Sequence, residues 1–132
     1  MRKFKIGDKG EFSKTITETD VYMFAGICGD FNPVHVNKVE AQKSIFGRPV
    51  VHGALVTSFI STVLGMYMPG PGSIYMEQNS RFLKPVFIGD TITVKVEIMD
   101  ISEKKVASLA TKIYNQEEEI VVDGCAKIKL PT

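Results

Sequence analysis

Cysteine is scarce in this sequence: Cys28 and Cys125 are the only two among 132 residues. Two cysteines do not make a disulfide framework, and the paired Cys-x-x-Cys spacing of many zinc sites is missing. These features argue against a disulfide-stabilised secreted scaffold and favour a reducing compartment. We expect each cysteine to be a small buried side chain.

Long apolar segments are missing as well. Residues 1–8 have no apolar core of signal-peptide length. The longest apolar run, near residues 54–68, is interrupted by four Ser and Thr side chains. It is too short and too polar for a transmembrane helix. We therefore expect a cytoplasmic protein with no membrane partner.

Neither sign of charge is in excess. Sixteen Lys and Arg stand against 15 Asp and Glu, which gives a net charge of +1. Proteins that bind nucleic acid normally carry a basic excess, so we expect no nucleic-acid partner. A ligand with a few phosphates needs only local Lys and Arg, and the balanced total does not argue against it.

The chain is also too short to favour a second domain. Its 132 residues, 44% of them apolar, suit one domain spanning residues 1–132. A chain of this size has an unfavourable surface-to-volume ratio. Pairing with a second copy would bury more surface, so a homodimer is expected and a higher oligomer stays open.

Helical spacing of apolar residues is present in the first half of the chain. It predicts a helix that begins after Thr17 or Thr19 and ends at Gly29. Residues 30–36 are predicted to be irregular, because a residue before proline is driven out of the helical region. A second short helix is predicted for residues 37–44.

A long apolar helix is predicted for residues 52–68. Its apolar positions go nearly all the way round, so it should be buried on most sides. Short turns separate the remaining segments, which alternate between apolar and polar residues and predict antiparallel strands. These extended segments are 4–16, 73–84, 92–98, 105–114 and 122–130. The predicted fold class is α+β, with a curved antiparallel sheet wrapped around one central helix.

Asp30 and His35 are the strongest candidates for chemistry. They lie five residues apart in a loop that Asn32 and Pro33 can stiffen. A rigid loop presenting a carboxylate and an imidazole can position groups for proton transfer. Asp-x-Asn-Pro is also a common turn, so spacing alone supports a structural and a functional role equally. Two histidines without a cysteine pair are not a standard zinc ligand set.

Gly53 is a second candidate, at the start of the apolar helix. Free N–H groups at a helix start favour developing negative charge, such as that of an enolate oxygen. A role in packing clearance is an equally good explanation of this glycine. For the neighbouring His52, a structural role is the better prediction than that of a second base. No Gly-x-Ser-x-Gly pattern surrounds Ser58 or Ser61, which argues against a serine hydrolase.

The segment Gly29-Asp30-Phe31-Asn32-Pro33-Val34-His35 resembles the hydratase motif of the MaoC-like hot-dog proteins. Within that family it is most similar to the (R)-specific enoyl-CoA hydratases. The resemblance extends over nearly the whole chain. It includes residues 47–53, 69–75 and 82–90, and the positions of Ser61 and Leu64.

The resemblance implies a hot-dog fold, a homodimer and active sites at the dimer interface. The implied reaction is syn addition of water to a trans-2-enoyl-CoA, giving the (3R)-3-hydroxyacyl-CoA. Asp30 and His35 would hold the water, and the Gly53 N–H would polarise the thioester carbonyl. Asn32, Ser61 and Leu64 are the implied substrate-binding residues, Leu64 in the acyl pocket. CoA is part of the substrate, and the resemblance implies no cofactor and no metal.

Four rival functions share this fold or this substrate class. Hot-dog thioesterases and some carrier-protein dehydratases place an acidic residue on the central helix, and residues 52–68 contain none. A MaoC-like 3-hydroxyacyl-acyl-carrier-protein dehydratase stays open, because its Asp and His pair would be identical. A non-catalytic domain that binds acyl-CoA would have no need of that pair.

Overall fold

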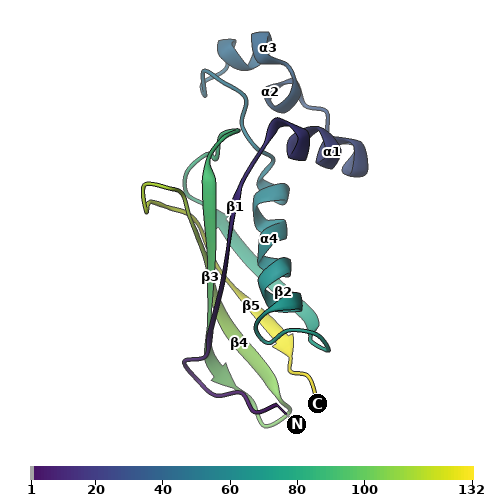
Figure 1. Cartoon of the computed structure of the whole chain (residues 1–132), viewed down its shortest axis with the longest axis vertical. Helices are drawn as coiled ribbons and strands as arrows, with labels where there is room; N and C mark the ends of the chain where they lie inside the picture. Colours follow the sequence, from purple (N-terminus) through teal and green to yellow (C-terminus); the bar gives the residue numbers. More distant parts are fainter. Residues whose placement is uncertain (1) are drawn as a thin grey trace.

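One five-stranded antiparallel sheet and one long helix make up the main body of the protein (Figure 1). The computed structural model describes residues 2–132. The strands are β1 (Lys9–Thr15), β2 (Ile74–Phe82), β3 (Thr91–Ile101), β4 (Val106–Tyr114) and β5 (Ile120–Lys129). Their order across the sheet is β1-β3-β4-β5-β2, and every pairing is antiparallel, as the short turns predicted.

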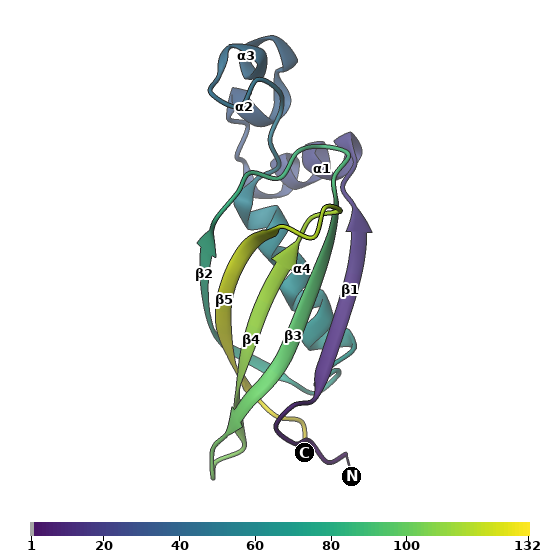
Figure 2. The same cartoon turned by 90° about the vertical axis from the view of Figure 1, so that its left-hand side faces the viewer.

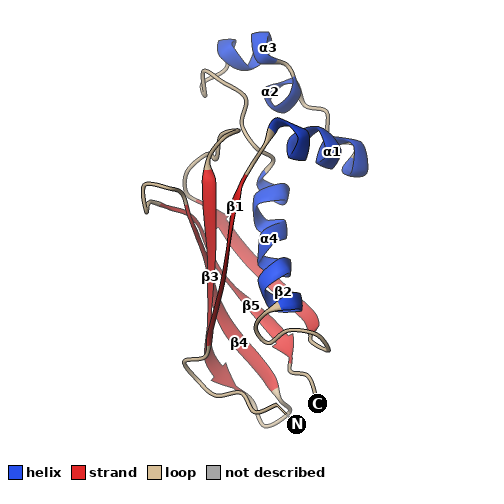
Figure 3. Cartoon of the chain, viewed as in Figure 1, coloured by secondary structure: helices blue, strands red, loops and turns tan. Residues whose placement is uncertain are grey.

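The long helix α4 (Gly53–Met66) lies along one face of the curved sheet (Figures 2 and 3). Its inward residues Leu55, Val56, Ile60, Val63 and Leu64 are buried. They meet the strand residues that alternation predicted to face inward, such as Ile92 and Val94 of β3, which are fully buried. The α+β class and the hot-dog arrangement are thereby confirmed.

One face of α4 remains uncovered, contrary to the expectation of burial on most sides. Ala54, Ser58, Ser61 and Gly65, spaced at helical intervals, are exposed, and Met66 is 65% exposed. The sheet curves against one side of the helix only (Figure 2). The apolar residues on all sides of α4 therefore do not show that this chain alone covers the helix.

Three shorter helices stand above the sheet, at the end opposite to the two termini (Figure 1). They are α1 (Glu18–Cys28), α2 (Pro33–Val36) and α3 (Lys38–Lys43). The first and third match the predicted helices. The expectation that residues 30–36 are irregular was wrong in part, because Asn32 caps a single helical turn that has Pro33 in its first position.

Both cysteines are exposed, so the expectation that they are small buried side chains was wrong. Cys28 is the last residue of α1, and Cys125 lies on β5 at a position that alternates with buried Ala126. No helix within residues 2–132 has the length and hydropathy needed to cross a membrane.

Candidate active site

The loop that carries Asp30 is fixed by caps on both sides. Gly29 ends α1 in the left-handed conformation (φ 83°), which favours glycine, and its N–H bonds to Ala25 O at 2.8 Å. The Asp30 Oδ1 atom accepts from Asn32 N–H at 3.1 Å. The Asn32 side chain in turn accepts from Val34 N–H at 3.2 Å, confirming that it fixes the turn. Backbone bonding therefore orients the Asp30 carboxylate before any ligand arrives.

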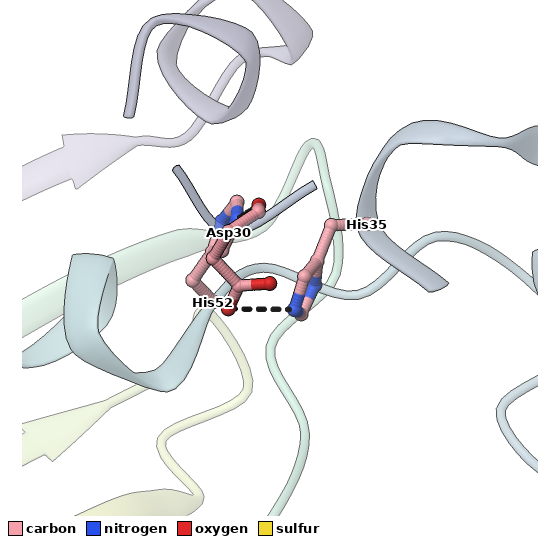
Figure 4. Close-up of side chains that lie close together, drawn as sticks. All are labelled: Asp30, His35 and His52. Carbon is pink, nitrogen blue, oxygen red and sulfur yellow. Dashed lines mark hydrogen bonds and ion pairs between the residues drawn. The ribbon is translucent and has the colours of Figure 1, made fainter. Parts of the chain in front are cut away.

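The carboxylate of Asp30 and the ring of His35 face one another (Figure 4). Asp30 Oδ2 lies 3.9 Å from His35 Nε2. The other ring nitrogen, Nδ1, lies 2.7 Å from Val50 O. A carbonyl oxygen only accepts, so Nδ1 carries the proton and a neutral His35 has its lone pair on Nε2. One water molecule could contact Oδ2 and Nε2 together, which is the arrangement that proton transfer needs.

The ring of His52 lies directly behind this pair. Its centroid is 3.9 Å from that of His35, with 27° between the ring planes. Its Nε2 lies 2.9 Å from the main-chain oxygen of Asp30, to which it must donate. Phe24 of α1 packs at 5.0 Å from the same ring. His52 is only 2% exposed, and its Nδ1 has no hydrogen-bond partner in the described part of the chain.

Gly53 begins α4 immediately after His52. No side chain caps this helix start, and the Gly53 N–H has no hydrogen-bond partner within residues 2–132. A methyl group added at Gly53 would lie 2.8 Å from the Phe82 ring. The glycine thus leaves an unpaired donor at a helix N-terminus, where partial positive charge gathers.

A cavity of about 450 Å³ joins these two halves of the site. Its wall includes Asn32, His35 and Gly53. The rest of its wall is mostly apolar and comes from four parts of the chain: Val34, Phe46, Val50, Val51, Val56, Phe82, Leu83, Lys84, Pro85, Val86 and Val122. A largely apolar cavity with a few polar groups is the usual form of a small-molecule site.

Asp30, His35 and His52 also lie close enough together to suggest a metal site. One potential ligand atom from each falls within 4.8 Å of the others. Each ring has one nitrogen bonded to a carbonyl oxygen and one lone pair left: Nε2 of His35 faces Asp30, and Nδ1 of His52 is buried. The arrangement suits water and proton transfer better than a shared ion.

Comparison with known proteins fits this geometry. The family profile described as "MaoC like domain" matches residues 3–120. The chain belongs to the MaoC-like family. It is 40% identical over 131 residues to an (R)-specific enoyl-CoA hydratase of Aeromonas caviae, covering 98% of each chain. It is 32% identical to a mitochondrial 3-hydroxyacyl-[acyl-carrier-protein] dehydratase of Arabidopsis thaliana, covering 96% of this chain and 78% of the relative.

A solved structure also matches this MaoC-like chain over its full length. It is an (R)-hydratase from A. caviae involved in PHA biosynthesis, and it superposes with a TM-score of 0.96. The two sequences are 40% identical, and the match covers 99% of this chain and 100% of the other. The hot-dog fold and the order of its elements are therefore shared along the whole chain.

The structure brings Asp30, Asn32, His35 and Gly53 of this MaoC-like chain together, but it places Ser61 and Leu64 elsewhere. Ser61 is exposed on the uncovered face of α4, eight residues past Gly53, and Leu64 is 1% exposed in the core. Neither lines the cavity beside His35. Their roles as substrate-binding residues stay predictions.

Sequence reasoning missed two partners in the site. The carbonyl of Val50, which orients His35, has no sequence signature, because a main-chain oxygen is present in every residue. The ring of Phe82, which packs against Gly53, lay within a predicted strand. The only sequence signal for a close approach to the backbone at this position was that residue 53 is a glycine at a helix start.

Proposed function

We propose that this protein is an (R)-specific enoyl-CoA hydratase, which adds water reversibly to trans-2-enoyl-CoA. The observation that carries the proposal is the facing Asp30 and His35 pair, beside a cavity that is lined by both His35 and Gly53, whose N–H is free within residues 2–132. Hydration needs an acid–base pair and an oxyanion site, and these residues supply both.

Each of these groups has a role in the proposed reaction. Water held by Asp30 and His35 attacks C3 of the enoyl thioester, and its proton passes to the pair. The electrons of the C2–C3 double bond move toward the thioester carbonyl, whose oxygen gains negative charge at the Gly53 N–H. The pair then delivers a proton to C2 from the same side. Addition of both parts of water from one side is syn addition. The face of C3 that water attacks decides the configuration, and the similarity to (R)-specific hydratases leads us to propose the (3R) alcohol.

We also propose that the protein works as a homodimer. Strand β2 forms one edge of the sheet, and its Ile74 and Met76 are 60% and 58% exposed. An exposed apolar edge strand is a template for pairing with another chain. Helix α4, one face of which is uncovered, lies near β2 in the main body (Figure 1). A second copy pairing at β2 would cover apolar surface that a single chain leaves in water.

Crotonyl-CoA tests the proposed function directly. Hydration removes the ultraviolet absorbance of the conjugated thioester, and chiral analysis of the product should give the (3R) alcohol. Lack of turnover with enoyl-CoA substrates of short and medium chain length would refute the proposal. Binding without turnover would favour a non-catalytic acyl-CoA-binding domain. Faster turnover of crotonyl-acyl-carrier protein than of crotonyl-CoA would favour the carrier-protein dehydratase.

Two variants test the catalytic pair. Asp30→Asn and His35→Ala should each lower kcat by roughly 100-fold or more, because general acid–base catalysis contributes on that scale. Asp100→Asn is a matched control, since Asp100 is an exposed carboxylate at the far end of β3. Wild-type kcat in both Asp30→Asn and His35→Ala would show that the loop is only a stiff turn.

A further inference from the structure

His52 connects the two halves of the site. It is the residue that precedes Gly53, and its own carbonyl accepts the first hydrogen bond of α4, from Val56 N–H at 3.1 Å. Its side chain reaches the other way, to the main chain of Asp30 and the ring of His35. One buried residue therefore contacts both catalytic candidates and determines where the helix start lies.

The chemistry of the ring indicates which contact matters. The Asp30 carbonyl needs a donor, and His52 supplies one from Nε2 at 2.9 Å. The opposite nitrogen, Nδ1, is buried without a partner in the part of the chain that the structure describes. A buried unpaired nitrogen is unfavourable. Phenylalanine would fill nearly the same space without it, so packing alone does not explain an imidazole here.

The surroundings of the two rings separate their contacts. The His52 ring is enclosed by the His35 ring and by Phe24 of α1, and its Nδ1 has no partner among the described residues. The Nε2 atom of His35 instead faces the Asp30 carboxylate. His35 is therefore the ring that adjoins the reacting water in the proposed mechanism, and His52 lies behind it.

We propose that His52 is a positioning residue, which acts through its Nε2–H on the Asp30 carbonyl to hold the acid–base pair against the helix start. The role rests on the proposed hydratase function. It also makes a prediction that is independent of catalysis: His52 is the Nε2–H tautomer, whereas His35 is the Nδ1–H tautomer. The chain has only these two histidines, so the nitrogen resonances of each ring can be assigned by replacing the other.

Nitrogen-15 nuclear magnetic resonance of the full chain tests the tautomers. Opposite tautomers, with a slowly exchanging Nε2 proton on His52, would support the proposal. A His52 ring protonated on Nδ1 alone would overturn it, whether or not the protein turns over crotonyl-CoA.

Kinetics of matched variants test the positioning role. His52→Gln keeps an N–H donor near the Nε2 position, whereas His52→Phe keeps an aromatic ring and loses the donor. We expect kcat of His52→Phe to fall roughly 10- to 100-fold with KM within about 3-fold, because a misplaced catalytic group costs rate on that scale. His52→Gln should recover kcat to within about 3-fold of the wild type.

Several outcomes would overturn the role. Equal losses of kcat in folded His52→Gln and His52→Phe would show that the hydrogen-bond donor does not matter. Wild-type kcat in both would show that neither the hydrogen bond to Asp30 nor the stacking on His35 matters. If His52→Phe does not fold, a folded His52→Gln with a 10-fold loss overturns the proposal. Ile98→Ala, in the core near the N-terminal segment, is the control for loss of stability alone. An inactive wild type would instead refute the hydratase function.

Discussion

A methyl group at Gly53 tests the oxyanion site most directly. The added carbon of Gly53→Ala would lie 2.8 Å from Cε1, 3.0 Å from Cζ and 3.3 Å from Cδ1 of the Phe82 ring. Carbon atoms pack at about 3.5–4.0 Å, so the ring must move by several tenths of an ångström. Phe82 is 58% exposed at the end of β2, which leaves it room to turn away.

The expected cost in stability is therefore small. Overpacking a rigid core costs about 1–3 kcal/mol, and a mobile exposed ring brings the cost to the lower end. Alanine regains up to about 1 kcal/mol over glycine where the backbone is helical. We expect the free energy of unfolding of Gly53→Ala to fall by no more than about 1 kcal/mol, or a few degrees in Tm.

The expected cost in activity is large, because the methyl group would stand where the thioester carbonyl must approach the Gly53 N–H. Loss of one oxyanion donor lowers rates by roughly 100- to 1,000-fold. We expect kcat/KM for crotonyl-CoA to fall on that scale while circular dichroism shows an intact fold.

A double variant separates the two explanations of such a loss. Phe82→Ala removes the ring that the methyl group strikes. If the methyl group blocks the substrate carbonyl, kcat/KM of Phe82→Ala should fall only mildly. The double variant Gly53→Ala/Phe82→Ala should then have the same low kcat/KM as Gly53→Ala. Recovery of kcat/KM in the double variant would refute the oxyanion role, since Gly53 would then serve only the packing of Phe82.

Two further predictions concern stability and assembly. Burial alone would raise the pKa of Asp20, but the hydrogen bonds from Thr17 and the Lys14 ammonium at 3.0 Å lower this pKa below its ordinary value. The stability that ionised Asp20 gives to the fold is therefore fully present above the ordinary pKa, and it is lost as the pH falls through the lowered pKa. Asp20→Asn should cost about 1 kcal/mol at pH 7, the scale of a helix cap, and urea denaturation at pH 7 and pH 2 should show the difference shrinking in acid; a constant difference would contradict this. Met76→Lys on the β2 edge should shift a dimer toward monomer in sedimentation equilibrium, and Met99→Lys, at an exposed position of β3, should not. Equal effects of the two lysines would argue against pairing at β2.

Much of the fold could be predicted because its signals are local. Ile92, Val94, Val96 and Ile98 alternate with polar residues, and all four are buried as period two requires. The helix that ends at Gly29 was likewise predicted from spacing and an end signal. The uncovered face of α4 could not be predicted in the same way. Hydropathy shows which residues avoid water but not whether the same chain or a second copy covers them.

The candidate site was predictable only to the extent that it is local. Asp30, Asn32 and His35 lie within six residues, and local hydrogen bonds hold the turn that carries them. The partners of the two rings are farther away in sequence: Val50 is 15 residues from His35, and His52 is 22 residues from Asp30. Such contacts form only when α4 and the helices above the sheet pack together.

This difference explains why His52 was expected to be merely structural. Beside a helix start, a histidine has an obvious local role, and its sequence neighbours give no sign of a distant carbonyl. The His52 side chain makes no hydrogen bond to the helix that it precedes. The ring points back toward Asp30 and His35 instead. His52 does not cap its own helix, and its side chain bonds a loop that is distant in sequence. The geometry of that loop therefore explains the histidine better than the stability of the helix does.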